Sequence, residues 1–139
     1  MRSSSRGSAL VEFAASLPVL SAVLFIGIEM ARASAHHVSL QFALTRAMRW
    51  AVLGQTLPAM TRAQSIKYKL QEIGTTYKLE INTADISVCP VAQPACGGSN
   101  PGLGGELIQI SASEEFQMVF GGWSLTLSSS VVGSNEPFT

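Results

Sequence analysis

One acidic side chain stands inside the most apolar stretch of the chain. Glu12 is the only charged residue between Ala9 and Ile28. A carboxylate inside a bilayer costs on the order of 3 kcal/mol, so it is rare there without a partner or a function. We therefore expect Glu12 to act by forming an ion pair. The plainer alternative is that it lies near the membrane surface, reaches water and has no role.

The two cysteines offer a second kind of chemistry. Cys89 and Cys96 are the only cysteines, and both follow the apolar stretch. In an oxidising compartment one even pair favours a disulfide, which would close the short loop across residues 90–95 and contribute about 2 kcal/mol. Free thiols or a redox pair remain the alternative, although the spacing does not form a CxxC motif.

The other polar residues form no catalytic or metal-binding pattern. The sequence contains no GxSxG, no HExxH and no glycine-rich phosphate loop. His36 and His37 are adjacent, so on a helix they point about 100° apart and are poorly placed to share a metal ion. Glu114 and Glu115 are expected to be charged surface residues at a strand end. We predict that the protein is not an enzyme and holds no cofactor or metal.

The apolar stretch from Ala9 to Ile28 is long enough to span a bilayer. At about 1.5 Å per residue it reaches roughly 30 Å, the thickness of the hydrocarbon core. Arg2 and Arg6 precede it, so the positive-inside bias places the N-terminus in the cytoplasm and the rest of the chain across the membrane. The alternative is a secretory signal peptide that is cut after Ala35. The formal net charge of zero makes nucleic acid a poor partner.

Counting from Gly7 gives Glu12 a more specific setting, because a cut after Gly7 makes Glu12 the fifth residue. This pattern resembles type IV pilin-like precursors, and more closely the start of TadE-like proteins, which are minor pilins or pseudopilins of the tight-adherence (Tad, Flp pilus) machinery. The resemblance covers residues 6–32 and is weak afterwards. The residues that carry it are Arg6-Gly7-Ser8-Ala9-Leu10-Val11-Glu12-Phe13-Ala14, Leu17-Pro18-Val19-Leu20 and Gly27-Ile28-Glu29-Met30-Ala31-Arg32.

The resemblance implies processing and an assembly role for the helix. A prepilin peptidase would cut between Gly7 and Ser8, and the ammonium freed on Ser8 could pair with Glu12 of the same or a neighbouring subunit and set the axial register. Phe13 belongs to the same assembly pattern. Pro18 lacks an amide hydrogen, so we expect it to kink or loosen the helix, although many spanning helices carry proline without such a role.

The rest of the chain predicts a small α+β domain. Residues 1–7 form the expected basic leader, 8–30 the transmembrane and assembly helix, and 31–139 the periplasmic domain, in which the helix continues over 31–54 and ends at Gly54. Thr56 and Pro58 suggest a second helix that ends at Gly74. Three or four antiparallel strands should follow, with candidates at residues 77–81, 86–88, 107–113 and 123–132, a turn at Gly121-Gly122 and a loop over 94–105. This is the layout of a type IV pilin-like fold.

Three functional interpretations follow from these features. The first is a minor pilin or pseudopilin, held in the bacterial inner membrane and assembled into Tad (Flp) pili for adherence. Its partners would be other pilin subunits, the prepilin peptidase and the Tad assembly platform. The second is an uncut single-pass membrane protein that acts as a periplasmic binding or scaffold module. The third is a small secreted domain released by signal peptidase.

Overall fold

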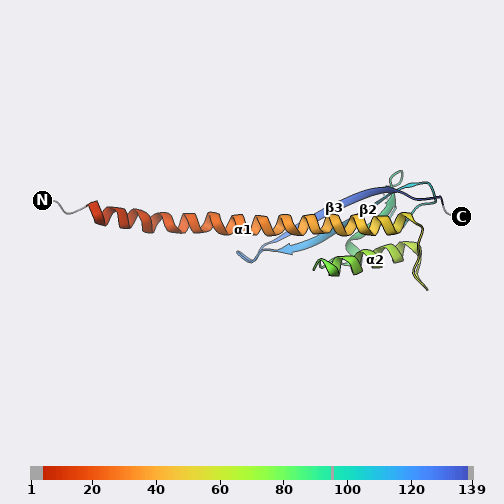
Figure 1. Cartoon of the computed structure of the whole chain (residues 1–139), viewed down its shortest axis with the longest axis horizontal. Helices are drawn as coiled ribbons and strands as arrows, with labels where there is room; N and C mark the ends of the chain where they lie inside the picture. Colours follow the sequence, from red (N-terminus) through yellow and green to blue (C-terminus); the bar gives the residue numbers. More distant parts are fainter. Residues whose placement is uncertain (1–4, 95, 138–139) are drawn as a thin grey trace.

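A single long helix forms the axis of the molecule. The computed structural model describes residues 5–94 and 96–137, with side chains from Ala9 onward, and helix α1 spans Ser5–Val52. At about 1.5 Å per residue this helix is roughly 72 Å long. Its N-terminal half projects far beyond the rest of the chain (Figure 1). The helix runs through Pro18 without interruption, and the kink expected there stays a prediction. Gly54, at φ 70°, follows the end of the helix, close to the predicted stop.

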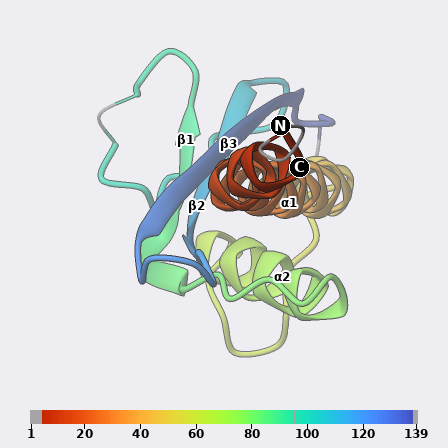
Figure 2. The ribbon, with the colours of Figure 1, turned by 90° about the vertical axis from the view of Figure 1, so that its left-hand side faces the viewer.

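The remaining elements build one sheet and one further helix. They are α2 (Arg62–Thr76), the 3₁₀ helix η1 (Thr83–Asp85), β1 (Ile86–Pro90), β2 (Leu107–Gln117) and β3 (Ser124–Ser134). The strands form an antiparallel sheet in the order β1-β2-β3. Figure 2 shows both helices on the same side of this sheet. The predicted α+β class, with a long apolar N-terminal helix, is confirmed.

The core lies between the C-terminal half of α1, α2 and one face of the sheet. Small residues on α1, such as Ala43 and Ala47, are fully buried and let the neighbouring elements approach closely. On β3, Gly133 has the same effect, because a Cβ there would lie 2.7 Å from Met48 Sδ. The larger buried side chains of the core are Leu40, Leu44, Ile66, Leu70, Ile86, Val88, Ile108 and Ile110.

Helix α2 begins later than the sequence predicts. Thr61 is its N-cap and forms a capping box with Gln64: the Gln64 amide donates to Thr61 Oγ1 over 3.3 Å, and the Thr61 amide donates to Gln64 Oε1 over 3.0 Å. Ala59, at φ 61°, lies outside the helix. Thr56 and Pro58 are therefore in the connection, and the helix ends two residues beyond Gly74 at Thr76. The apolar face of α2 packs against α1, with Ile66 and Leu70 fully buried.

The first predicted strand, residues 77–81, is not a strand. Lys78 adopts a positive φ of 58°, and the amides of Tyr77 and Leu79 both donate to the Gly74 carbonyl, over 2.9 and 3.0 Å. These bonds close the end of α2 and turn the chain back on itself. Leu79 and Ile81 are nevertheless buried, because the loop packs their side chains against α2. The apolar alternation thus reflects burial without strand pairing.

The β2–β3 hairpin is longer than predicted. Strand β2 continues beyond Ser113 to Gln117, paired throughout with β3. The predicted turn is confirmed: Gly121 and Gly122 have φ values of 91° and 64°, and the Met118 amide donates to the Trp123 carbonyl over 2.9 Å. Tight hairpin turns need such positive φ angles, which glycine adopts without strain. The hairpin therefore reaches back along α1 toward the N-terminal half (Figure 1).

At the opposite end of the domain, Arg62 holds three segments together. Its guanidinium donates to the carbonyl of Ala51 over 3.0 Å, to the carbonyl of Gly102 over 3.0 Å and to Asn135 Oδ1 over 2.8 Å. Asn135 is itself buried and donates to the carbonyls of Pro101 and Leu103. Burial lowers the pKa of Arg62 from its ordinary value. The cation is compensated by these oxygen atoms, one of which belongs to the last turn of α1.

Replacing Arg62 should therefore destabilise the domain strongly. Arg62→Ala removes the donor to the Gly102 carbonyl and to Oδ1 of the buried Asn135, and we expect a loss of about 3 kcal/mol in the free energy of unfolding. The exposed Arg49→Ala on α1 serves as control and should change it by less than about 0.5 kcal/mol. Urea unfolding in detergent measures both; equal losses would show that the Arg62 contacts contribute little.

Candidate membrane and assembly site on the first helix

The N-terminal half of α1 presents apolar side chains that nothing in the described part of the chain covers. From Ala9 to Ile28 every residue is exposed except Ser21, which is partly buried, and none of the most apolar 18-residue window is buried. By length and composition this helix can cross a membrane. An apolar surface of this extent needs lipid or protein around it. Its exposed large side chains are Leu10, Val11, Phe13, Leu17, Val19, Leu20, Val23, Leu24, Phe25, Ile26 and Ile28.

The predicted processing and register residues lie at the tip of this half. Gly7 and Ser8 fall in the first turns of α1, and their side chains lie outside the described residues, as do residues 1–4 of the predicted leader. Glu12 and Phe13 are both exposed on the helix surface. Pro18 lies one and a half turns further on and offers no amide hydrogen to the carbonyl of Ala14. The predicted residues therefore lie on one continuous helix that is long enough to span a bilayer.

A cluster of polar and aromatic side chains marks the point where α1 meets the sheet. We call Glu29, Arg32, His36, Glu114 and Phe116 the border cluster. Glu29 is the first charged residue after Glu12; it is buried, and both of its carboxylate oxygens accept hydrogen bonds from Arg32 Nη1 over 3.0 Å. The Arg32 guanidinium lies 5.3 Å from the centre of the Phe116 ring, and the His36 ring lies 5.0 Å from it.

Glu114 corrects the expectation from the sequence. It is buried, with 5% of its surface exposed, and is not a surface carboxylate. Its Oε1 accepts a hydrogen bond from the Glu80 amide over 3.1 Å and lies 3.7 Å from His36 Nδ1. The neighbouring Glu115 is exposed, as predicted. The signal was present in the sequence, because Glu114 continues the inward-facing series of Ile110 and Ala112 at a spacing of two.

The border cluster is suited to structure more than to catalysis. A small open pocket of about 240 Å³ lies beside it, lined in part by Lys78, Glu80 and Glu115. The cluster contains two carboxylates, a guanidinium and an imidazole, and its carboxylates are engaged by Arg32 and by the Glu80 amide. Its contacts tie β2 to α1 where the apolar half begins.

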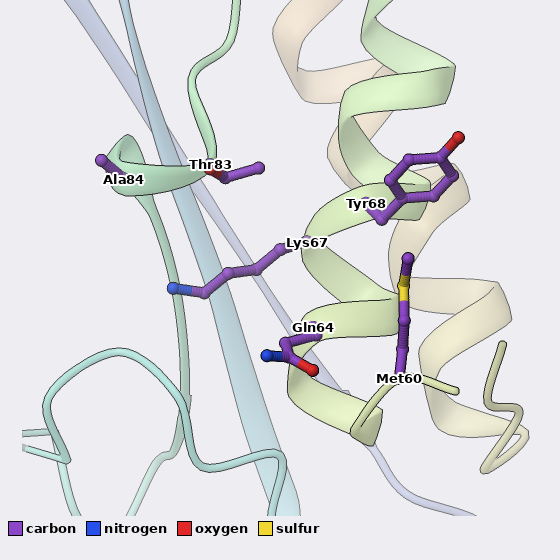
Figure 3. Close-up of a pocket in the computed structure, with 6 residues that line it drawn as sticks. All are labelled: Met60, Gln64, Lys67, Tyr68, Thr83 and Ala84. Atoms are coloured by element: carbon purple, nitrogen blue, oxygen red, sulfur yellow. The ribbon is translucent and has the colours of Figure 1, made fainter. Parts of the chain in front are cut away.

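A second groove lies on the outer side of α2. It has a volume of about 540 Å³ and is lined by Met60, Gln64, Lys67, Tyr68, Thr83 and Ala84. Figure 3 shows Lys67 extending away from Tyr68 and Met60, so the polar ends do not converge on one point. Within residues 5–94 and 96–137, no group of three or more His, Cys, Asp or Glu side chains could hold a metal ion.

Cys89 and Cys96 are joined in a disulfide in the structure. Their Cα atoms are 5.8 Å apart, within the usual range for this bond. The disulfide links β1 to the loop that follows it. That loop also runs along β1 through backbone hydrogen bonds, from Val88 N to the Gly98 carbonyl and from Asn100 N to the Val88 carbonyl. The bond therefore braces a loop that is already attached to the sheet.

Substitutions of two adjacent carboxylates test whether the border cluster stabilises the fold. Glu114→Ala removes the buried acceptor of the Glu80 amide and leaves a gap beside α1, so we expect a loss of about 2 kcal/mol in the free energy of unfolding. Glu115→Ala, one residue along on the exposed face, should cost less than about 0.5 kcal/mol. Thermal unfolding in detergent compares them. Equal effects would show that the burial of Glu114 contributes nothing.

The comparisons with known proteins agree with the location of this site. Residues 7–49 match the sequence model of the TadE-like protein family, so the match lies within α1 and covers the apolar half, the border residues on α1 and part of the buried spine. No curated protein and no solved structure matches the chain. The match agrees with the resemblance that the N-terminal residues show: over this helix the chain is similar to TadE-like proteins.

Proposed function

We propose that the chain is a minor pilin or pseudopilin, which α1 first anchors in the inner membrane and then joins to other subunits of a Tad (Flp) pilus used for adherence. The observation that best supports this is the division of α1 into two halves. One half is an exposed apolar rod and the other is the buried spine of an α+β domain. A helix built in this way can serve as a membrane anchor and as an assembly surface in turn.

The spine half also has an apolar surface directed away from the domain. Val38 and Phe42, one turn apart, are exposed, whereas Leu40 and Leu44 are buried in the core. Side chains four residues apart share one helix face. This exposed face continues the apolar rod beyond the membrane, where a parallel helix of another subunit could cover it.

Cleavage after Gly7 would create a new positive charge close to Glu12. The new ammonium on Ser8 would lie four residues before Glu12, one helical turn or about 6 Å along the axis. In lipid or in a packed bundle an unpaired carboxylate is costly, and the ammonium of the same or a neighbouring subunit cancels its charge. A neighbouring ammonium satisfies Glu12 only when the two helices are at a defined height. The pair would therefore fix the axial register.

The competing interpretations fit the geometry less well. Release by signal peptidase after Ala35 would cut α1 in the middle of an unbroken helix, beside the buried Ala33, and would separate Arg32 from His36 within the border cluster. An uncut membrane protein accounts for the apolar rod. It does not explain why Glu12 is the fifth residue after Gly7.

The N-terminal sequence of the mature protein distinguishes these three proposals. We expect it to begin at Ser8, and we expect Gly7→Val to leave the leader in place, because the peptidase of pilin-like precursors cuts after glycine. Edman degradation or mass spectrometry of the membrane fraction measures this. A mature protein that begins at Met1 or at His36 would contradict the proposal.

Variants of Glu12 test the register pair. Glu12→Ala and the isosteric Glu12→Gln should both enter the membrane normally, because each removes a charge from the apolar segment. Both should reduce the amount of assembled pili by about tenfold or more, since breaking a desolvated ion pair costs about 3–5 kcal/mol. Immunoblots of sheared pili and of membranes give the two readouts, with Ser16→Ala as the control. Unchanged assembly in Glu12→Gln would show that the charge is not needed.

A further inference from the structure

The tip of the β2–β3 hairpin exposes a second apolar surface. Within residues 118–123, Val119 is 67% exposed, Phe120 48% and Trp123 74%. The chain carries no charged residue between Glu115 and Glu136. No charged side chain therefore opposes the transfer of this end of the hairpin out of water. A tryptophan exposed to this extent beside an exposed phenylalanine and two glycines is unusual for a loop surrounded only by solvent.

The tip lies beside the apolar half of α1 and beyond the border cluster. The ring centres of Phe120 and Phe25 are 4.4 Å apart, and the hairpin points toward the N-terminus in Figure 1. Phe25 precedes Glu29, the first charged residue after the apolar segment, by four residues, or about 6 Å along the helix. Any membrane that surrounds α1 up to Ile28 therefore reaches the level of the tip.

The spacing along the two elements agrees with this placement. From Arg32 back to Phe25 the helix covers about 10 Å, and the four residues from Phe116 to Phe120, which leave β2 after Gln117, reach at most about 13 Å. Since Arg32 contacts Phe116 and Phe25 contacts Phe120, hairpin and helix run side by side over this distance. The charged border and the apolar tip thus lie at different heights along α1.

We propose that the hairpin tip inserts into the bilayer interface next to α1, on the side of the membrane where the domain lies, and that it binds phospholipid as a second membrane contact. Trp123 is the interfacial anchor, because an indole ring combines an apolar body with an N–H donor and prefers the level of the headgroups. Phe120 and Val119 reach the adjoining acyl chains. This inference rests on the proposed membrane role of α1, and it fixes the rotation and height of the domain above the bilayer.

Fluorescence of the full chain in nanodiscs of phosphatidylethanolamine and phosphatidylglycerol tests the proposal. The protein has two tryptophans, so Trp50→Phe leaves Trp123 as the only emitter, and Trp123→Phe leaves Trp50. We expect brominated phospholipid to reduce the emission of Trp123 by roughly twofold or more, as suits a ring at interface depth, with little effect of the aqueous quencher acrylamide. Trp50 lies 25 residues, or about 37 Å, beyond Phe25 along α1 and should not respond to bromine.

A charged substitution at the hairpin tip, compared with one away from the tip, provides a matched pair of variants. In the Trp50→Phe background, Phe120→Asp should abolish the bromine quenching of Trp123, whereas Ser130→Asp, on the exposed face of β3 away from the tip, should leave it unchanged. Both variants should still elute with the nanodiscs, because α1 is intact. Persistent bromine quenching in Phe120→Asp would overturn the proposal.

The remaining outcomes separate this inference from the function on which it rests. If the chain elutes with nanodiscs but Trp123 is quenched by acrylamide and not by bromine, the tip is in water and the inference fails while the anchor stands. If Trp123 is shielded from both quenchers, protein covers the tip and the inference also fails. A chain that does not enter nanodiscs at all would overturn the membrane role of α1 together with this inference.

Discussion

The length of α1 relative to the domain that it carries is the constraint on which the structure depends. A helix of 48 residues is roughly 72 Å long, and the sheet and α2 cover only its C-terminal half (Figure 1). That half has small residues such as Ala43 and Ala47 where the other elements approach. The other half has large apolar residues on every face. The described part of the chain covers only the second half, which leaves the first half exposed as a surface suited to lipid or to other subunits.

Two polar networks determine where the buried half of α1 begins and ends. At its start, Glu29 and Arg32 form a partly buried ion pair against Phe116, and Glu114 on β2 lies 3.7 Å from His36 on α1. At its end, Arg62 and the Glu136 amide satisfy the carbonyls of Ala51 and Val52, which the helix cannot pair internally. Hydrogen bonds depend on direction, whereas apolar contacts do not. The networks therefore hold the sheet at one height along a helix whose apolar face alone would permit sliding.

The sequence predicts the features that depend on local pattern and misses those that depend on pairing. Periodicity indicates the long helix, and the glycine pair Gly121-Gly122 indicates the hairpin turn. Leu79 and Ile81 alternate with polar residues just as a strand does, yet the bonds to Gly74 make them a loop. Thr56 and Pro58 suggest the start of α2, but the N-cap of the helix is Thr61, which forms a capping box with Gln64. The burial of Glu114 follows the spacing of two from Ile110 and Ala112, but the length of β2 that carries this series to Glu114 depends on its pairing with β3, opposite Leu127.

The contact between Phe25 and Phe120 couples the membrane helix to the domain. Since Phe116 is held by Arg32 and His36 as well, the hairpin contacts α1 on both sides of the charged border. In the assembly that we propose, α1 could not slide past the domain without breaking these contacts. It would move together with the hairpin, so the apolar rod and the apolar tip would leave the bilayer as one body. An assembly that accepts α1 therefore also has to cover Phe120 and Trp123, and this requirement sets the size of the surface that a neighbouring subunit must provide.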